Sequence, residues 1–134
     1  LSADGFVFGT PVHYAAAAGG ITSFLDRIFY ICGKKLADKP GAAIVSCRRG
    51  GASAAFDQMN KYFTISNMPV VSSQYWKRVH GNKPEEVLQD VEGLQVMRNL
   101  GRNMAWLLKC LEAGRNTGVA VPVNEYDNKT NFIR

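Results

Sequence analysis

The sequence has few cysteines and no arrangement of them that would bind a metal. Among its 134 residues are three cysteines, Cys32, Cys47 and Cys110, which lie far apart and form no Cys-x-x-Cys pair. An odd number of separated cysteines is typical of a reducing compartment and offers no frame for zinc or an iron–sulfur cluster. We therefore expect a cytoplasmic protein whose own residues hold no metal. Cys32 and Cys110 have apolar neighbours, so we expect both to be buried.

Long hydrophobic runs are also missing. No apolar run approaches the roughly 18 residues of a membrane-spanning helix, and no basic segment followed by an apolar one opens the sequence. We expect a protein that neither crosses a membrane nor is secreted. The sequence starts on Leu1 and enters an apolar run within five residues, so we expect the domain to begin before residue 1.

No large excess of one charge is present either. Sixteen lysines and arginines against eleven acidic residues give a net charge of +5, and the basic residues are spread over both halves of the sequence. The small excess favours anionic partners. The densest basic group lacks the interleaved aromatic residues on which single-stranded nucleic acids stack, so we expect no nucleic-acid partner. This group consists of Lys34, Lys35, Lys39, Arg48 and Arg49.

The sequence does contain enough apolar residues for one folded domain. Hydrophobic residues make up 46% of the chain, which at this length supports a single core without disulfides or metals. Three short apolar runs near glycine or proline predict buried strands at residues 5–9, 42–47 and 70–73. We expect residues 1–114 to belong to this domain, and residues 115–134 to extend over its surface or onto a neighbour.

Helical patterns alternate with these strands. Apolar residues spaced by three and four positions predict a helix over residues 21–31, a second after Gly51, and a long one over residues 84–113 that Gly93 would divide. Strands alternating with helices are typical of an α/β fold with a doubly wound parallel sheet. Three strands alone would expose apolar edges, so we expect further strands outside this sequence.

Two loops follow the carboxyl ends of the first two predicted strands, where open parallel sheets bind their ligands. The first loop is stiffened by a proline, and the alanines and glycines after it let a flat ligand approach the backbone closely. It comprises Thr10, Pro11, Val12, His13, Tyr14 and Ala15. A plain tight turn is the alternative interpretation of these residues.

The second loop combines two arginines with two glycines before a helix. It comprises Ser46, Cys47, Arg48, Arg49, Gly50 and Gly51. Glycines at a helix start expose backbone N–H groups where the helix dipole favours negative charge. We predict that this loop binds a phosphate or the electron-rich edge of a ring, whereas the alternative for the arginines is solvated surface charge.

Taken in order, these motifs resemble those of one known family. Residues 3–14 and 24–27 resemble the A-D-G-hydrophobic-G-[ST]-P-V-Y stretch and the F-L-D-R helix of the flavodoxin-like NADPH-dependent FMN reductases. That family includes iron–sulfur flavoproteins and multimeric NAD(P)H:quinone oxidoreductases. Residues 48–51 resemble the R-G-G loop of the same proteins, and residues 79–81 and 90–106 contain motifs that resemble its flavodoxin family proteins.

The resemblance implies a flavodoxin-like sheet of strand order 2-1-3-4-5 that binds FMN non-covalently, with the three predicted strands as its third to fifth. Thr10 to Ala15 would line the isoalloxazine ring, and Ser46 to Gly51 would cover its pyrimidine edge. Arg48 or Arg49 would stabilise negative charge near N1. His13 stands where the family usually has tyrosine or another aromatic residue. The family's phosphate-binding strand and loop, and the cysteine cluster of its iron–sulfur members, have no counterpart in this sequence.

The same resemblance implies an activity. We expect an FMN-dependent oxidoreductase that passes electrons from NAD(P)H to a quinone, flavin or other small acceptor, assembled as a homodimer or homotetramer. One alternative is an electron-transfer flavoprotein without its own substrate, with any iron–sulfur cluster held by residues outside this sequence. Another is a cofactor-free interaction domain. Tyr75 and Trp76 are expected to cap a flavin, to lie at a subunit contact or to pack against the long helix, and His80 is interpreted as a turn residue.

Overall fold

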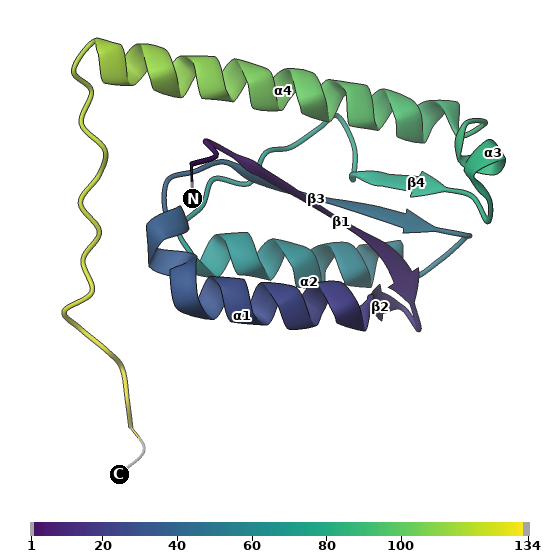
Figure 1. Ribbon diagram of the computed structural model, residues 1–134, viewed down its shortest axis with the longest axis horizontal. Coiled ribbons are helices and arrows are strands. Elements are labelled where there is room, and N and C mark those ends of the chain that lie inside the picture. The colour runs from purple at the N-terminus through teal and green to yellow at the C-terminus, as the bar shows by residue number, and fades with distance from the viewer. Residues whose placement is uncertain (1, 133–134) are drawn as a thin grey trace.

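The computed structural model describes residues 2–132 and shows a sheet with helices on both faces (Figure 1). Its four strands are β1 (Phe6–His13), β2 (Ala16–Ala17), β3 (Gly41–Cys47) and β4 (Arg78–His80), and they lie in the order β2-β1-β3-β4. β1, β3 and β4 are parallel, whereas β2 pairs antiparallel with the end of β1. The predicted α/β class is therefore confirmed.

Two layers of helices cover the sheet. α1 (Gly19–Leu36) and α2 (Ala52–Ile65) lie on one face, and α4 (Val91–Asn116) crosses the other (Figure 1). Side chains alternate along β1, so that Phe6 and Phe8 pack on the α1 and α2 side while Val7 between them is half-exposed. β3 lies between both layers, and five of its seven residues are buried.

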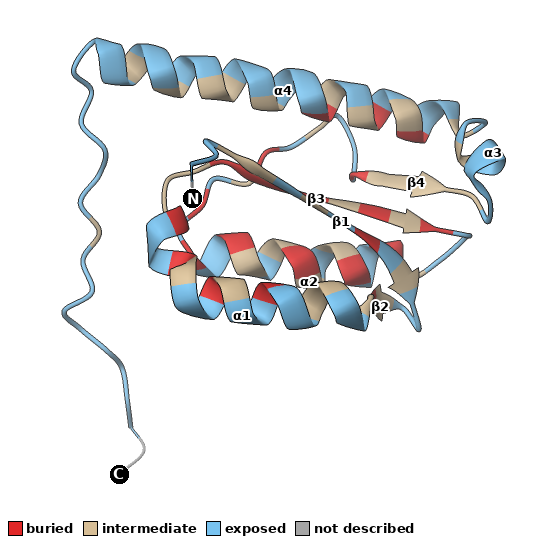
Figure 2. Ribbon diagram, in the orientation of Figure 1, coloured by how far each residue is buried: buried red, intermediate tan, exposed pale blue. Residues whose placement is uncertain are grey.

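The main core is aromatic and lies between the sheet and the first two helices. Phe8 and Phe63 stack with their ring centroids 5.9 Å apart, and Phe29 meets both rings edge-on at 6.1 and 6.2 Å. The buried residues of α1 and α2 recur every three or four positions and face the sheet (Figure 2). They are Leu25, Phe29, Gly33, Leu36, Ala52, Ala55, Met59 and Phe63.

A smaller core lies under α4. Leu100 packs with Ala42 of β3 and with Val71, and the cluster is completed by Ile44, Met104 and Leu107. Only one stripe of α4 takes part, and Trp106 on its outer side is 68% exposed. Among residues 2–132, no helix is both long and apolar enough to cross a membrane.

The predicted strand at residues 70–73 is wrong, because the chain touches the sheet at Val70 and then leaves it. Val70 forms an isolated bridge with Gly41, and the chain returns only at Arg78, which pairs with Val45. Between these two contacts β3 advances four residues, from Gly41 to Val45, while the neighbouring segment advances eight, from Val70 to Arg78. The adjacent valines at positions 70 and 71 led to a strand being predicted at the first of these contacts, whereas the strand itself, β4, forms at the second. The predicted strands at 5–9 and 42–47 are confirmed, although β1 continues to His13.

The long predicted helix is divided before Gly93 rather than at it. α3 (Pro84–Val87) has Leu88 as its C-cap. α4 has Asp90 as its N-cap, whose carboxylate accepts a hydrogen bond of 2.9 Å from the Gly93 N–H. The same carboxylate accepts the His80 N–H at 2.7 Å, which ties α4 to the end of β4. A Cβ at position 93 would lie 2.4 Å from the Asp90 carboxylate, so the glycine makes room for the cap.

Replacing Asp90 with alanine is expected to lower the free energy of unfolding by about 0.5–2 kcal/mol at neutral pH, because α4 loses its N-cap. Burial alone would raise the pKa of Asp90, but hydrogen bonds from Gly93 and His80 lower it overall. A lowered carboxyl pKa stabilises the fold above the unfolded value of about 3.9, and this contribution is lost as pH falls through the lower folded value.

Urea unfolding at several pH values measures both effects. The difference between wild type and Asp90→Ala should be full at pH above about 5 and shrink in acid. Asp57→Ala, which removes an exposed carboxylate from α2, is the matched control. An equal loss in both variants, or a difference that is constant with pH, would contradict this role of Asp90.

The expectation that Cys32 and Cys110 are both buried agrees with the structure only in part. Cys32 is half-buried, but Cys110 is exposed on α4, so the prediction that Cys110 is buried is wrong. Its apolar neighbours in the sequence lie on a helix of which one stripe alone contacts the sheet.

Residues 117–132 form no helix or strand and extend along the molecule (Figure 1). The Asn67 side chain donates a 2.9 Å hydrogen bond to the Asn124 Oδ1 in this extension.

Candidate functional site

The two predicted loops lie against each other at the carboxyl ends of β1 and β3. β1 turns into β2 through Tyr14 and Ala15, whose φ angles of 50° and 59° are both in the left-handed region. Gly51, at the start of α2, also has a positive φ of 81° and packs against this turn. A Cβ on Gly51 would lie 2.8 Å from the Ala15 Cα and 2.9 Å from the Val12 Cγ1. The absence of a side chain at Gly51 therefore allows the two loops to meet.

The first predicted loop is more ordered than a plain turn. Thr10 to His13, predicted as loop residues, belong to β1 because the strand continues through them into a hairpin with β2. Thr10 is 4% exposed, and its hydroxyl accepts a 3.0 Å hydrogen bond from the Ala18 N–H and donates at 2.9 Å to the Pro11 carbonyl. The side chain of Gln58 on α2 accepts the Ala17 N–H at 3.1 Å. These bonds hold the hairpin against α2, while the Tyr14 side chain at its tip is fully exposed.

The second loop places positive charge at the start of α2. Arg48, Arg49 and Gly50 are exposed, and no carboxylate of residues 2–132 is found in an ion pair with either arginine. No side chain caps the first turn of α2, and that turn contains no acidic residue. Its N–H groups and the helix dipole therefore favour a negatively charged or electron-rich group at this position.

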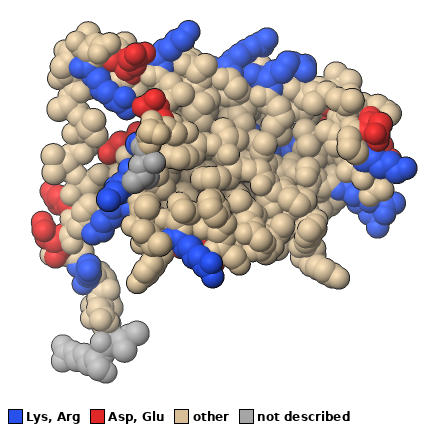
Figure 3. Space-filling model, viewed as in Figure 1, with Lys and Arg blue, Asp and Glu red and all other residues tan. Residues whose placement is uncertain are grey.

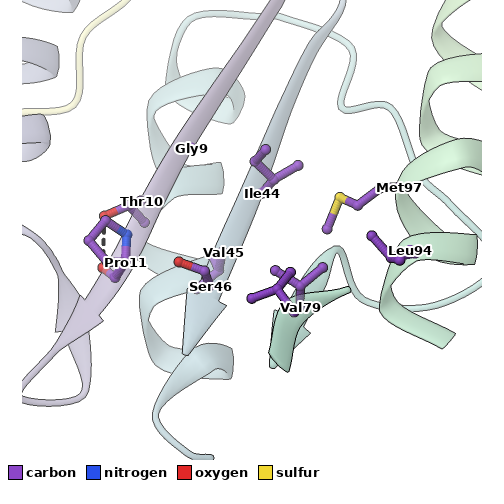
Figure 4. A pocket seen from close by; sticks show the side chains of 10 residues that line it. Gly9, Thr10, Pro11, Ile44, Val45, Ser46, Val79, Leu94 and Met97 are labelled. Carbon is purple, nitrogen blue, oxygen red and sulfur yellow. Dashed lines mark hydrogen bonds between the residues drawn. The ribbon is translucent and has the colours of Figure 1, made fainter. Parts of the chain in front are cut away.

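An apolar cavity of about 420 Å³ opens beside both loops, on the α4 side of the sheet. Figure 4 shows Thr10 and Pro11 on β1, Ser46 on β3 and Val79 on β4, with Leu94 and Met97 of α4 across from them. Gly9, Ile44, Val45 and Val87 complete the lining. The volume lies within the range of small-molecule sites, and the apolar walls suit a flat ring. The prediction from the sequence did not include Leu94 and Met97 of α4 in the site. The apolar stripe of the helix that contains them was the one feature that could have indicated their part in it.

Cys47 does not have the character of a reactive thiol. It is buried at the end of β3, and burial raises its pKa, an effect that Arg78 opposes and Asp90 reinforces. A thiol with a raised pKa is a weak nucleophile at neutral pH. We therefore interpret Cys47 as a packing residue at the base of the second loop.

The residues left without a role lie together along β4. The rings of Tyr75 and Trp76 are 5.1 Å apart, and the Arg78 guanidinium lies 5.7 and 5.5 Å from their respective centroids. His80 is more than a turn residue, because its Nδ1 lies 3.4 Å from the Asp90 carboxylate. These groups lie at the β4 edge of the sheet and do not belong to the two loops on β1 and β3.

Charge and potential metal ligands are dispersed. On the face shown in Figure 3, the lysines and arginines form several separate groups rather than one basic surface. Residues 2–132 contain no group of three or more His, Cys, Asp or Glu side chains that could hold a metal ion.

Comparisons with known proteins point to a family and a fold. The family model described as NADPH-dependent FMN reductase matches residues 1–83. An iron–sulfur flavoprotein of Methanocaldococcus jannaschii is 29% identical over 118 aligned residues, and the alignment covers 82% of this chain and 61% of that protein. A second iron–sulfur flavoprotein of the same organism is 32% identical over 110 residues, covering 72% of this chain and 54% of that protein.

The chain thus spans less than two thirds of the length of these relatives. Among solved structures, the flavodoxin, WrbA-like protein from Agrobacterium tumefaciens matches with a TM-score of 0.61 and 16% identity, over 76% of this chain and 67% of that one. At this identity the match supports the fold alone, and that fold is flavodoxin-like.

Proposed function

Because the chain belongs to the NADPH-dependent FMN reductase family, we propose that it contributes the flavin-contacting loops of an FMN-dependent oxidoreductase. Its electron donor would be NADH or NADPH, and its acceptor a quinone, a free flavin or another small molecule. The observation that carries this proposal is the contact between the two loops, Gly51 against Val12 and Ala15, at the carboxyl ends of adjacent parallel strands. Open parallel sheets bind their ligands at that edge.

The residues of this edge fit a flavin. The uncapped first turn of α2 would offer N–H groups to the pyrimidine oxygens, and Arg48 or Arg49 would stabilise negative charge there. The hairpin from Thr10 to Ala15 would orient the ring, and the apolar cavity beside it would exclude water from part of the ring surface. When bound, FMN supplies the hydride- and electron-transfer chemistry, so the side chains need only bind and orient it.

The names of the two archaeal relatives support a second candidate, an electron-transfer flavoprotein that works with an iron–sulfur cluster. We assign no cluster ligand to residues 2–132, which contain no suitable group of side chains. A cofactor-free interaction domain is the third candidate. A homodimeric or homotetrameric assembly, a cytoplasmic location and the limits of the domain at residues 1–114 stay predictions from the sequence.

The full-length gene product is expected to carry FMN, or to take it up with a 1:1 stoichiometry, and to show the visible absorption of an oxidised flavin, whereas residues 1–134 alone are expected to bind FMN weakly or not at all. Anaerobic addition of NADPH or NADH should bleach this absorption, and an added quinone should restore it. Visible spectroscopy with calorimetric titration of FMN measures both steps. A protein that stays colourless and binds neither FMN nor nucleotide would contradict the proposal and favour the cofactor-free domain.

Steady-state kinetics separates the two flavoprotein candidates. An oxidoreductase oxidises NADPH or NADH continuously when a quinone or free flavin is present. An electron-transfer protein holds FMN but turns over with none of these acceptors until a redox partner protein is supplied. FMN binding without turnover would therefore favour the second candidate and reject the first.

A further inference from the structure

A second cavity lies between α2 and the segment that leaves the sheet after Val70. Its volume is about 470 Å³, and its lining includes Phe56 and Asn60 of α2 together with Tyr75, Trp76 and Lys77. None of these residues belongs to the two loops proposed to contact FMN. Tyr75 and Trp76 are each about half-exposed, so the cavity is open to solvent on their side.

Lys77 brings a buried positive charge to this cavity. The residue is 2% exposed, and its ammonium donates a hydrogen bond to the Val71 carbonyl and lies 5.1 Å from the centre of the Phe56 ring. Within residues 2–132 no carboxylate forms an ion pair with it. Lysines are almost never this buried without an anionic partner. Burial accordingly lowers the pKa of Lys77 to about 8.

Asn60 brings an unsatisfied acceptor to the same cavity. Its Oδ1 is buried, and no donor of the described residues reaches it. A buried polar atom without a partner is energetically unfavourable, so such an atom in a ligand-sized cavity indicates a missing donor. The cavity thus presents a cationic donor and a neutral acceptor.

Three aromatic residues form part of the remaining lining, together with Val70, Ser72, Ser73 and Gln74. Phe56 lies on one side, and the rings of Tyr75 and Trp76 are tilted by 45° to each other and held by the Arg78 guanidinium. Aromatic side chains favour a flat ring by offset stacking and edge contacts. A ligand for this cavity therefore needs an anionic group, a hydrogen-bond donor and an aromatic ring.

We propose that this cavity binds a small hydroxylated aromatic carboxylate. Its carboxylate accepts from the Lys77 ammonium, its hydroxyl donates to the Asn60 Oδ1, and its ring lies among Phe56, Tyr75 and Trp76. The proposal goes beyond the oxidoreductase function and does not depend on it, because binding at this cavity requires neither flavin nor turnover.

Calorimetric titration of the purified protein with the three hydroxybenzoate isomers, benzoate and phenol tests this proposal. At least one hydroxybenzoate should bind about tenfold more tightly than benzoate or phenol, since each lacks one of two hydrogen bonds. Lys77→Met should lower the affinity about tenfold or more, and Asn60→Leu should abolish the preference for hydroxybenzoate over benzoate. The exposed neighbour Lys61 provides the matched control, because Lys61→Met removes the same charge and should change neither value.

Nuclear magnetic resonance of the unmodified protein keeps the test independent of how the variants fold. Adding the preferred hydroxybenzoate should shift the Trp76 indole N–H and the Asn60 side-chain amide, while the indole N–H of the exposed Trp106 should not move. Equal weak binding of all five compounds, unchanged affinity in Lys77→Met, or shifts that avoid Asn60 and Trp76 would each overturn the proposal.

Discussion

Replacing Phe63 with alanine is expected to lower the free energy of unfolding by about 3–5 kcal/mol. Phe63 is fully buried, and its ring joins Phe8 of β1 to Phe29 of α1. Its ring also fills the space beside Gly41 at the start of β3, where an added Cβ would lie 2.5 Å from the ring. Removing the ring therefore leaves a cavity at the point where two helices and two strands meet.

Chemical denaturation followed by far-ultraviolet circular dichroism measures this loss. The matched control is Ile65→Ala, in the same helix two residues further on, because Ile65 is 86% exposed. Exposed substitutions of this kind usually change stability by less than about 0.5 kcal/mol. Similar losses in the two variants would show that α2 does not pack as described.

Replacing Gly51 with alanine is expected to cost about 2–4 kcal/mol and to weaken FMN binding, because it affects both loops at once. The φ of 81° at Gly51 is strained for any residue with a Cβ, and that Cβ would overlap backbone and side-chain atoms of the hairpin. The hairpin and the second loop must then separate.

Gly50→Ala is the control for this prediction. Gly50 is the preceding residue in the same loop, has no positive φ, and would keep an added Cβ more than 4 Å from the heavy atoms of other parts of the chain. Calorimetric titration of FMN into both variants, beside their unfolding curves, compares the two glycines directly. If Gly51→Ala binds FMN as tightly as Gly50→Ala, the contact between the loops has no part in holding the flavin.

The sequence was sufficient where one hydrophobic pattern determined one element. The apolar runs at 5–9 and 42–47 and the glycines that bound them predicted β1 and β3, although only β3 is buried on both faces, since Val7 of β1 is half-exposed. The two loops followed from the ends of these strands. Their mutual contact was not visible in the sequence, since it depends on the left-handed turn at Tyr14 and Ala15 and on the positive φ of Gly51.

The sequence failed where tertiary contacts decide between equivalent local patterns. Val70 and Val71 have a higher strand propensity than the Lys77 to His80 stretch, yet β4 pairs at Arg78–His80 because Asp90 and the start of α4 fix that end. Lys77 and Asn60 had no motif to mark them, since their importance lies in burial and in the absence of a partner. Such features depend on packing, which a local pattern does not encode.

The detour between Val70 and Arg78 has a consequence for how this protein can diverge. Both ends of the detour are fixed to β3, through the Gly41–Val70 bridge and the Val45–Arg78 pair, so its exposed residues can change without shifting the sheet register, whereas Val71 and Lys77 are buried. The loops on β1 and β3 are separated from that variation. Substitutions at the exposed residues of the detour can therefore change the chemistry at the β4 edge of the sheet without altering the two loops.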